Sequence, residues 1–365
     1  GVVGPDEYHE PVDDNAFTNM IARWVLRRAA ELVECAPAGA SNVTAEEVQE
    51  WREVAARLVD GYDHNTGIYE QFAGFHRLEA LLIAEVAPRR PIAADVLLGA
   101  DRVRGAQVLK QADVLMLHHL LPDQVVPGSL EPNLRYYEPR TAHGSSLSPA
   151  IHAALFARVR DYERAVAALR LAARIDLDDL TGSSAAGMHI ATMGGLWQAL
   201  VVGFAGVRAA EDGLEIDPRL PPSWGALDVR VRFRGSRVHV HITRDRVGVT
   251  AEPSVDVLIG AGVHLAEPTG LQLRRRGTDW EVPRRLLAAI DDTAAATPVL
   301  QTALGVAPLL GATVEALRIA DEPGVTARAG AERLGVPLRT LAGDPLQEIL
   351  RATEAVDVVG VVVGA

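Results

Sequence analysis

One polar stretch, YYEPRTAHGSSLS at 136–148, holds many of the side chains best suited to binding or moving charge. It combines tyrosines, a glutamate, an arginine, a histidine and serines. Its apolar residues follow neither the helical nor the strand period, which is typical of a loop. A helix is expected to follow, because Ser148 can cap it and Pro149 suits its first turn. Ile151, Leu155 and Phe156 would form the buried stripe of that helix.

Three side chains of this loop, His143, Ser145 and Ser146, would lie just before the helix N-terminus. Unpaired backbone N–H groups and the helix dipole favour an anion at such a position. A loop that merely caps the helix would have the same composition, so the stretch alone leaves both interpretations open.

Lys110 is the single lysine among 36 basic residues. The chain is rich in alanine, arginine and valine, and this bias has replaced lysine by arginine at positions where either cation can fill the same role. The remaining lysine is therefore expected to supply a compact ammonium group that a planar guanidinium cannot replace.

The opening segment, GVVGPDEYHEPVDDNAFTN, carries several acidic groups ahead of an amphipathic helix that begins near Phe17. Asp13 and Asp14 are explained by the helix dipole, which favours negative charge in the first turn. Glu7 lies beyond Pro11 and outside that turn, so it is the better candidate for a functional carboxylate.

Helical patterns then alternate with long polar loops as far as residue 208. Thr44 and Glu47 form a capping box for a second helix, and further helices are expected at 107–121, 147–158, 161–174 and 188–208. The aromatic-rich loop at 61–79 suits either stacking on a sugar or filling the mouth of a barrel. This alternation is typical of a helical barrel or toroid with a site at one rim.

The period changes near Gly213. Strict alternation at 227–242 around an RGS turn predicts a β-hairpin with one solvated face. His239 and His241 lie on its polar face, and without a partner cluster we interpret them as surface residues rather than metal ligands. From 286 onwards, strands alternate with helices at 297–310, 325–334 and 345–353, which predicts a doubly wound α/β unit.

Composition limits the function. The net charge of −12 argues against a nucleic-acid partner, and no apolar run is long enough to span a membrane. Cys35 is the single cysteine, which excludes an internal disulfide framework and fits a reducing compartment, so we expect a cytoplasmic location. No cofactor is expected.

Four motifs, GPDEYHE, KQADV, YYEPRTAHGSSLSP and GMHIATMGG, resemble glycoside hydrolase family 65 in order and spacing. The resemblance covers residues 1 to about 250 and implies an inverting phosphorylase of α-glucosides such as trehalose, maltose or kojibiose, with inorganic phosphate as co-substrate. It implies Glu7 as the general acid. The residues matching the family's phosphate-binding motifs are Lys110, Gln111, His143, Ser145 and Ser146. Gly144 departs from the family's more usual aspartate.

The resemblance implies a multidomain fold. Residues 1–208 would form the second half of an (α/α)6 barrel and 209–273 a small antiparallel β-layer. Residues 284–365 resemble the universal stress protein domain, as an incomplete doubly wound unit. We expect this segment not to bind ATP, because the glycine-rich stretch that follows the last strand in ATP-binding members is missing. We also expect half a barrel not to be a competent enzyme alone.

Two alternatives stay open at the level of the sequence. One is a family hydrolase of the trehalase kind, in which Glu138 or Asp113 helps water attack. The other is a non-catalytic sensor whose C-terminal unit binds a nucleotide or dimerises. A homodimer is allowed by each interpretation and required by none.

Overall fold

The computed structural model describes residues 1–37, 42–320, 325–355 and 357–364. The chain forms two compact units, the first made of 1–209 with 215–224 and the second of 210–214 with 225–365. The three domains expected from the sequence, with boundaries at 208, 273 and 284, stay a prediction.

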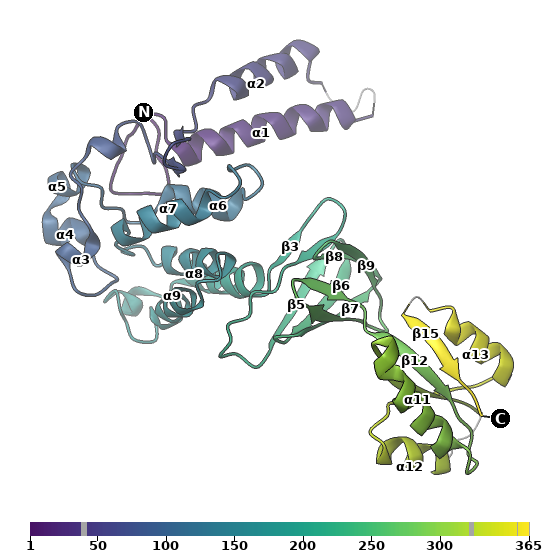
Figure 1. Cartoon of the computed structure of the whole chain (residues 1–365). Helices are drawn as coiled ribbons and strands as arrows, with labels where there is room; N and C mark the ends of the chain where they lie inside the picture. Colours follow the sequence, from purple (N-terminus) through teal and green to yellow (C-terminus); the bar gives the residue numbers. More distant parts are fainter. Residues whose placement is uncertain (38–41, 321–324, 356, 365) are drawn as a thin grey trace. The chain divides into compact units, whose positions relative to one another are not determined.

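The first unit begins with two long helices that lie side by side (Figure 1), α1 (Ala16–Cys35) and α2 (Ala45–Arg57). The Thr44–Glu47 capping box of α2 is present, as predicted. On α1, Met20 is buried against Leu117 and Leu121, whereas Trp24 remains 40% exposed. The predicted apolar stripe of α1 is therefore only partly covered.

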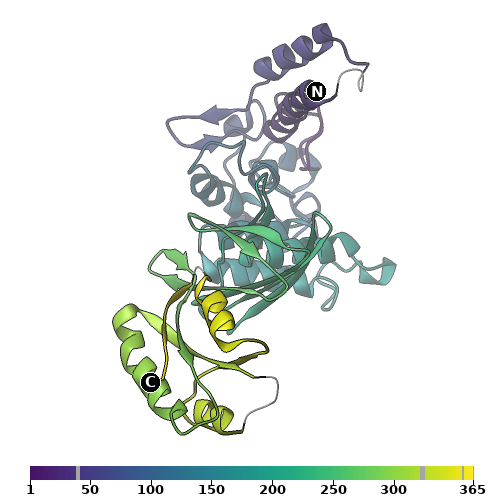
Figure 2. The same cartoon turned by 90° about the vertical axis from the view of Figure 1, so that its right-hand side faces the viewer.

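The aromatic-rich segment forms the hairpin β1 (Tyr62–Asp63) and β2 (Ile68–Tyr69), visible in Figure 2, and a short 3-10 turn, Phe75–Arg77. Tyr69, Phe72 and Phe75 are buried, and Phe75 contacts the ring of Tyr137. These three rings are core, so only the half-buried and exposed residues of the segment are available to a ligand.

Short helices follow, namely α3 (Ile83–Val86), α4 (Ala94–Leu98) and α5 (Ala100–Arg104). The next helix, α6 (Asp113–Leu120), is shorter than the predicted 107–121. The reason is that Leu109 pairs with Thr141 in a strand-like bridge, which holds the preceding residues extended. A helix that the sequence did not predict, α7 (Leu130–Tyr137), takes up Tyr136 and Tyr137. The loop interpretation of 136–148 was therefore wrong at its start.

The helices α8 (Ser148–Arg158) and α9 (Tyr162–Arg174) match the prediction closely, and Ile151, Leu155 and Phe156 are buried. Ser148 does not cap α8, because its hydroxyl is engaged with His143 and with the carbonyl of Ser145. The predicted helix at 188–208 is α10 (Ile190–Gln198) followed by a wider π-type turn over Ala199–Phe204. The short strands β3 (Val207–Ala209) and β4 (Leu214–Ile216) come next.

The second unit holds a five-stranded antiparallel sheet in the order β11-β10-β7-β6-β5. Its strands are β5 (Leu227–Phe233), β6 (Ser236–Ile242), β7 (Arg246–Glu252), β10 (Leu271–Arg276) and β11 (Asp279–Glu281). The predicted hairpin is confirmed, with Val229 paired to Val240. A further antiparallel pair is formed by β8 (Val255–Ile259) and β9 (Gly262–Ala266).

A parallel sheet in the order β14-β13-β12-β15 completes the unit, built from β12 (Arg284–Ala289), β13 (Ala312–Ile319), β14 (Leu338–Leu341) and β15 (Val358–Val362). The helices α11 (Ala296–Leu310) and α12 (Val325–Arg333) cover one face, where Leu286 and Ala288 point. The opposite face, with Leu287 and Leu317, packs on α13 (Pro345–Thr353) (Figures 1 and 2). Among the described residues, no helix is both long and apolar enough to cross a membrane.

Candidate active site

A direct ion pair joins two of the sequence-predicted residues, although they lie 103 positions apart. The ammonium nitrogen of Lys110 is 2.5 Å from Glu7 Oε2. Gln111 approaches the same carboxylate, with its amide nitrogen 3.4 Å from Glu7 Oε1, and also donates to the carbonyl of Pro5. The side chains of Glu7 and Lys110 are 53% and 26% exposed, so both can reach a ligand.

A buried carboxylate network fixes the loop that carries Glu7. The backbone N–H of Asp6 donates to Asp113 Oδ1 at 2.6 Å, and the backbone N–H of Lys110 donates to Asp6 Oδ1 at 2.9 Å. His9 Nδ1 lies 2.7 Å from Asp6 Oδ2. Because Asp6, His9 and Asp113 are all buried, the two loops are locked together beneath the Glu7–Lys110 pair.

Asp113 is the most perturbed carboxylate of this network. Burial, and secondarily the charge of Asp6, raises the pKa of Asp113 to about 8. Asn15 donates to its second oxygen at 2.6 Å. A β-carbon on Gly4 would stand 2.1 Å from that oxygen, so only glycine fits there. Asp113 therefore serves as a scaffold inside the protein.

The electrostatics of Glu7 are dominated by Lys110. The hydrogen bond from Lys110 holds the pKa of Glu7 below its ordinary value, against a smaller opposing effect of burial. A carboxylate in this state is ionised at neutral pH. An anion bound to Lys110 would compensate its charge and let the Glu7 pKa rise, as a proton donor requires.

The loop that precedes α8 lies against Lys110. Leu109 N–H donates to the carbonyl of Arg140 at 2.9 Å, and Ala142 N–H donates to the carbonyl of Leu109 at 2.7 Å. A β-carbon on Gly144 would lie 3.6 Å from Lys110 Cγ and only 2.8 Å from the carbonyl oxygen of Ile92. This crowding explains why the chain has glycine at 144.

His143 is buried, and its Nδ1 lies 2.7 Å from the hydroxyl of Ser148. Its ring meets that of His152 edge-on, with the centroids 4.6 Å apart. Burial holds the pKa of His143 well below its ordinary value, so the imidazole is neutral. Its left-handed backbone, with φ of 54°, turns the chain sharply into Gly144.

The two predicted serines differ in setting. Ser145 is buried, and its hydroxyl accepts from Leu147 N–H at 3.4 Å. Ser146 is half-buried, and its carbonyl accepts from the hydroxyl of Thr192 at 3.0 Å. Within the described part of the chain, direct contacts join Lys110 to Glu7, but none joins Lys110 to the side chains of His143 or the serines. The predicted site residues therefore fall into two groups. Glu7, Lys110 and Gln111 contact one another, whereas His143, Ser145 and Ser146 lie in the adjoining loop before α8.

Sequence reasoning missed the residues that position this cluster. Asp6, His9 and Asn15 were visible only as polar residues near the predicted acid, and nothing in their types indicated burial. Tyr8 is also buried, and its hydroxyl accepts from Ala94 N–H at 2.9 Å. His152 is 2% exposed and lies beside a small apolar recess that Gln111 also lines. Its place in the apolar stripe of α8 gave no functional signal.

The carboxylates considered for a hydrolase are engaged elsewhere. Glu138 pairs with Arg90, whose nitrogen is 2.5 Å from its Oε1. Asp113 is buried in the network described above. In the second unit, His239 and His241 share Asp228 at 2.8 and 3.0 Å on an exposed face. No group of three His, Cys, Asp or Glu residues suited to a metal ion occurs among the described residues.

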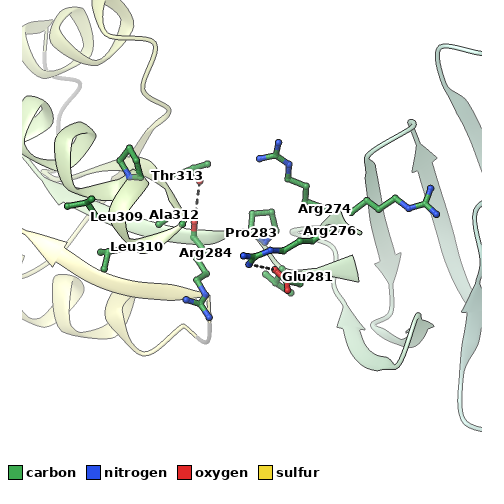
Figure 3. A pocket seen from close by; sticks show the side chains of 13 residues that line it. Arg274, Arg276, Glu281, Pro283, Arg284, Leu309, Leu310, Ala312 and Thr313 are labelled. Carbon is green, nitrogen blue, oxygen red and sulfur yellow. Dashed lines mark hydrogen bonds and ion pairs between the residues drawn. The ribbon is translucent and has the colours of Figure 1, made fainter. Parts of the chain in front are cut away.

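A separate hollow of about 720 Å³ lies in the second unit and is lined by arginines of β10 and by the start of β12 and β13 (Figure 3). Arg276 pairs with Glu281 at 3.3 Å there, and Thr313 donates to the carbonyl of Arg284 at 3.4 Å. None of the sequence-predicted site residues lines it.

Comparison with known proteins identifies the family. Residues 1–198 match the glycosyl hydrolase family 65 central catalytic domain, and residues 207–260 match the C-terminal domain of the same family. The chain belongs to glycosyl hydrolase family 65. Its first match therefore contains Glu7, Lys110 and the loop before α8.

Relatives in this family include named phosphorylases. The chain is 34% identical over 263 residues to a kojibiose phosphorylase of Caldanaerobacter subterraneus subsp. tengcongensis, a match covering 68% of this chain and 34% of the relative. It is 32% identical over 251 residues to the maltose phosphorylase of Bacillus subtilis, covering 68% and 33%. The chain thus spans about a third of the length of these relatives.

A solved structure, provisionally named as a kojibiose phosphorylase from human microbiome, superposes with a TM-score of 0.68 at 25% identity. The match covers 75% of this chain and 39% of the solved one. The mixed helical and sheet architecture is therefore that of a family 65 structure.

Proposed function

We propose that this chain carries the acid and phosphate-binding side of an inverting α-glucoside phosphorylase. The observation that carries the proposal is the ion pair between Glu7 and Lys110. It brings a carboxylate that can protonate a leaving oxygen beside the single lysine of the chain. Relatives named as kojibiose, maltose and trehalose phosphorylases support the same substrate class.

In this proposal Glu7 protonates the glycosidic oxygen while inorganic phosphate attacks the anomeric carbon from the opposite face of the sugar ring. Phosphate is the nucleophile, so no second carboxylate is needed to activate water. The residues that would hold phosphate are Lys110, Gln111, His143, Ser145 and Ser146. A cation and neutral donors in a partly buried loop suit a dianion, because charge-assisted hydrogen bonds to phosphate are strong.

The ion pair also provides a means of timing the proton transfer. Before phosphate binds, Lys110 keeps Glu7 ionised. Phosphate bound at Lys110 would take over its charge, so that Glu7 gains the proton it must donate. Acid and nucleophile would then become ready in the same step.

Hydrolysis by water is the weaker alternative. It needs a carboxylate free to activate water, and Glu138 and Asp113 are each held by other groups.

We further propose that 1–208 is the second half of an (α/α)6 barrel, followed by a β-layer over 209–273. The run of helices from α1 to α10 supports the half-barrel, and the antiparallel sheet supports the β-layer. For 284–365 we propose a universal stress protein-like unit, supported by the four-stranded parallel sheet with helices on both faces. The single cysteine, exposed and free, fits a cytoplasmic location.

The proposal is tested by assaying the full-length gene product on a panel of α-linked glucobioses with and without phosphate. Release of glucose that depends on phosphate, and a Michaelis constant for phosphate that rises far more than that for the sugar in Lys110→Gln, would support it. Equal release without phosphate would assign hydrolysis instead.

A further inference from the structure

A hollow of about 130 Å³ lies in the first unit, where α6 and α8 end. The candidate active site lies at the opposite ends of these helices, at Asp113 and Ser148. The eight residues of α6 alone rise about 12 Å, so the two places are separate. The charged and polar residues lining the hollow are His119, Asp123, Arg158, Arg208, Glu215 and Arg219.

The carboxylates of this hollow are already paired. Arg208 binds Asp123 at 2.8 Å and Glu215 at 2.6 Å. Arg219 binds Asp217 at 2.5 Å. These pairs leave no carboxylate for a further cation.

Arg158 is a third arginine of the hollow, and no carboxylate is left to pair with it. It donates to the carbonyl of His118 at 2.6 Å, and none of the ion pairs found among the described residues includes it. Burial, and then the charges of Arg219 and Arg208, lowers the pKa of Arg158 to about 10. The charges of Asp123 and Asp217 act in the opposite direction, but both carboxylates are paired with other arginines. A bound anion would therefore give the partly desolvated Arg158 guanidinium a charged partner in direct contact.

His119 gives a second, independent sign of a ligand. It is 7% exposed, and its Nε2 lies 2.6 Å from the amide oxygen of Gln198. Its Nδ1 is buried and has no hydrogen-bond partner within the described chain. Buried polar atoms are nearly always paired, so an unpaired nitrogen lining a hollow indicates a missing partner.

We infer that this hollow binds a small oxyanion that carries a proton, such as hydrogen phosphate, through Arg158 and His119. The guanidinium fork of Arg158 donates to two oxygens. His119 Nε2 donates to the amide oxygen of Gln198 and burial lowers the pKa of His119, so its Nδ1 carries no proton and accepts from the P–OH group of hydrogen phosphate. The site is distinct from the phosphate site proposed at Lys110 and does not depend on that proposal.

Calorimetric titration with inorganic phosphate at low ionic strength tests this inference, in a Lys110→Gln background that removes the proposed catalytic phosphate site. One phosphate should still bind. Arg158→Gln should weaken it about tenfold or more, the loss expected for a charge-assisted hydrogen bond. Arg160→Gln is the matched control, because it removes an exposed arginine two positions away and should have little effect.

Val202→Phe provides a second variant that keeps every charge and fills the hollow, in case Arg158→Gln fails to fold. It should also weaken binding. Sulfate and acetate carry no O–H group at neutral pH and should compete only weakly with phosphate. Competition by either anion as strong as that by phosphate itself would show that His119 takes no part and would overturn the inference. Absence of phosphate binding in the Lys110→Gln background, or binding unchanged by both Arg158→Gln and Val202→Phe, would overturn the inference.

Discussion

The pair formed by Glu7 and Lys110 brings the proposed proton donor and the proposed anion-binding cation into one contact. Neither group alone indicates a phosphorylase, because isolated carboxylates and lysines are common on protein surfaces. Their value lies in the coupling, since the protonation of Glu7 depends on what compensates Lys110. Predictions at this scale concern that coupling.

In the full-length gene product, Glu7→Gln should lower turnover of a natural disaccharide by about 10²–10⁴-fold, the usual contribution of general acid catalysis. Substrates with activated leaving groups should lose much less, because they need little protonation. Steady-state kinetics on both substrate types measure the difference. Glu10→Gln, an exposed carboxylate of the same loop, is the control and should stay near wild type. Equal losses on both substrate types would remove Glu7 from the acid role.

Lys110→Gln should raise the pKa of Glu7 towards its ordinary value, because the lowering hydrogen bond and charge are lost. The ion pair stabilises the fold only while Glu7 is ionised. Its contribution is therefore present above the unfolded-state pKa of Glu7 and disappears as the pH falls through the folded-state pKa. Carboxyl-detected NMR titration gives the pKa, and unfolding curves against pH give the stability. A Glu7 pKa that is the same in both proteins would contradict the pairing.

Sequence reasoning predicted the chemical groups but not their supports. Lys110 was recognisable because arginine had replaced every other lysine, and Glu7 because no helix turn explained it. Asp6, His9 and Asp113 hold the site through buried contacts between segments about a hundred residues apart. Such long-range burial leaves no local pattern in the sequence, so these supports could not be predicted.

At the scale of elements, the site depends on three loops that pack closely. Gly144 marks the tightest approach, against Ile92 and the side chain of Lys110. In this chain the loop comes so close to Ile92 and Lys110 that a side chain at 144 would require one of these segments to shift.

Gly144→Ala should lower the free energy of unfolding by about 1–3 kcal/mol through overpacking, and it should weaken phosphate binding at Lys110. Gly194→Ala is the matched control. Gly194 is exposed in α10, and a β-carbon there would have no atom within 4 Å. Gly194→Ala should therefore raise the free energy of unfolding by about 0.5–1 kcal/mol. Denaturant unfolding of both variants measures the contrast. If Gly144→Ala left the free energy of unfolding unchanged, the loops would be able to separate without loss of stability.

Elements with strong periods were predicted well and those set by tertiary contacts were not. The capping box of α2, the helix α8 and the hairpin β5–β6 follow from local spacing. The start of α6 was missed because pairing of Leu109 with Thr141 keeps that segment extended. The hydroxyl of Ser148 binds His143 instead of capping, a choice that only the folded loop determines.

At the scale of the whole molecule, family membership covers the first unit and part of the second, up to residue 260. The two compact units divide near residue 209, close to the change of period seen in the sequence. The hollow at Arg158 and the cluster at Lys110 lie at opposite ends of α6 and α8. We therefore propose two anion-binding places of different construction in the first unit.

The identity of the sugar product tests the central claim most directly. Phosphorus and proton NMR of the full-length gene product, incubated with an α-linked glucobiose and phosphate, would follow the reaction. Inverting phosphorolysis predicts β-glucose 1-phosphate and glucose in equal amounts, with neither formed when phosphate is omitted. Free glucose from both halves of the disaccharide, at the same rate with and without phosphate, would contradict the account.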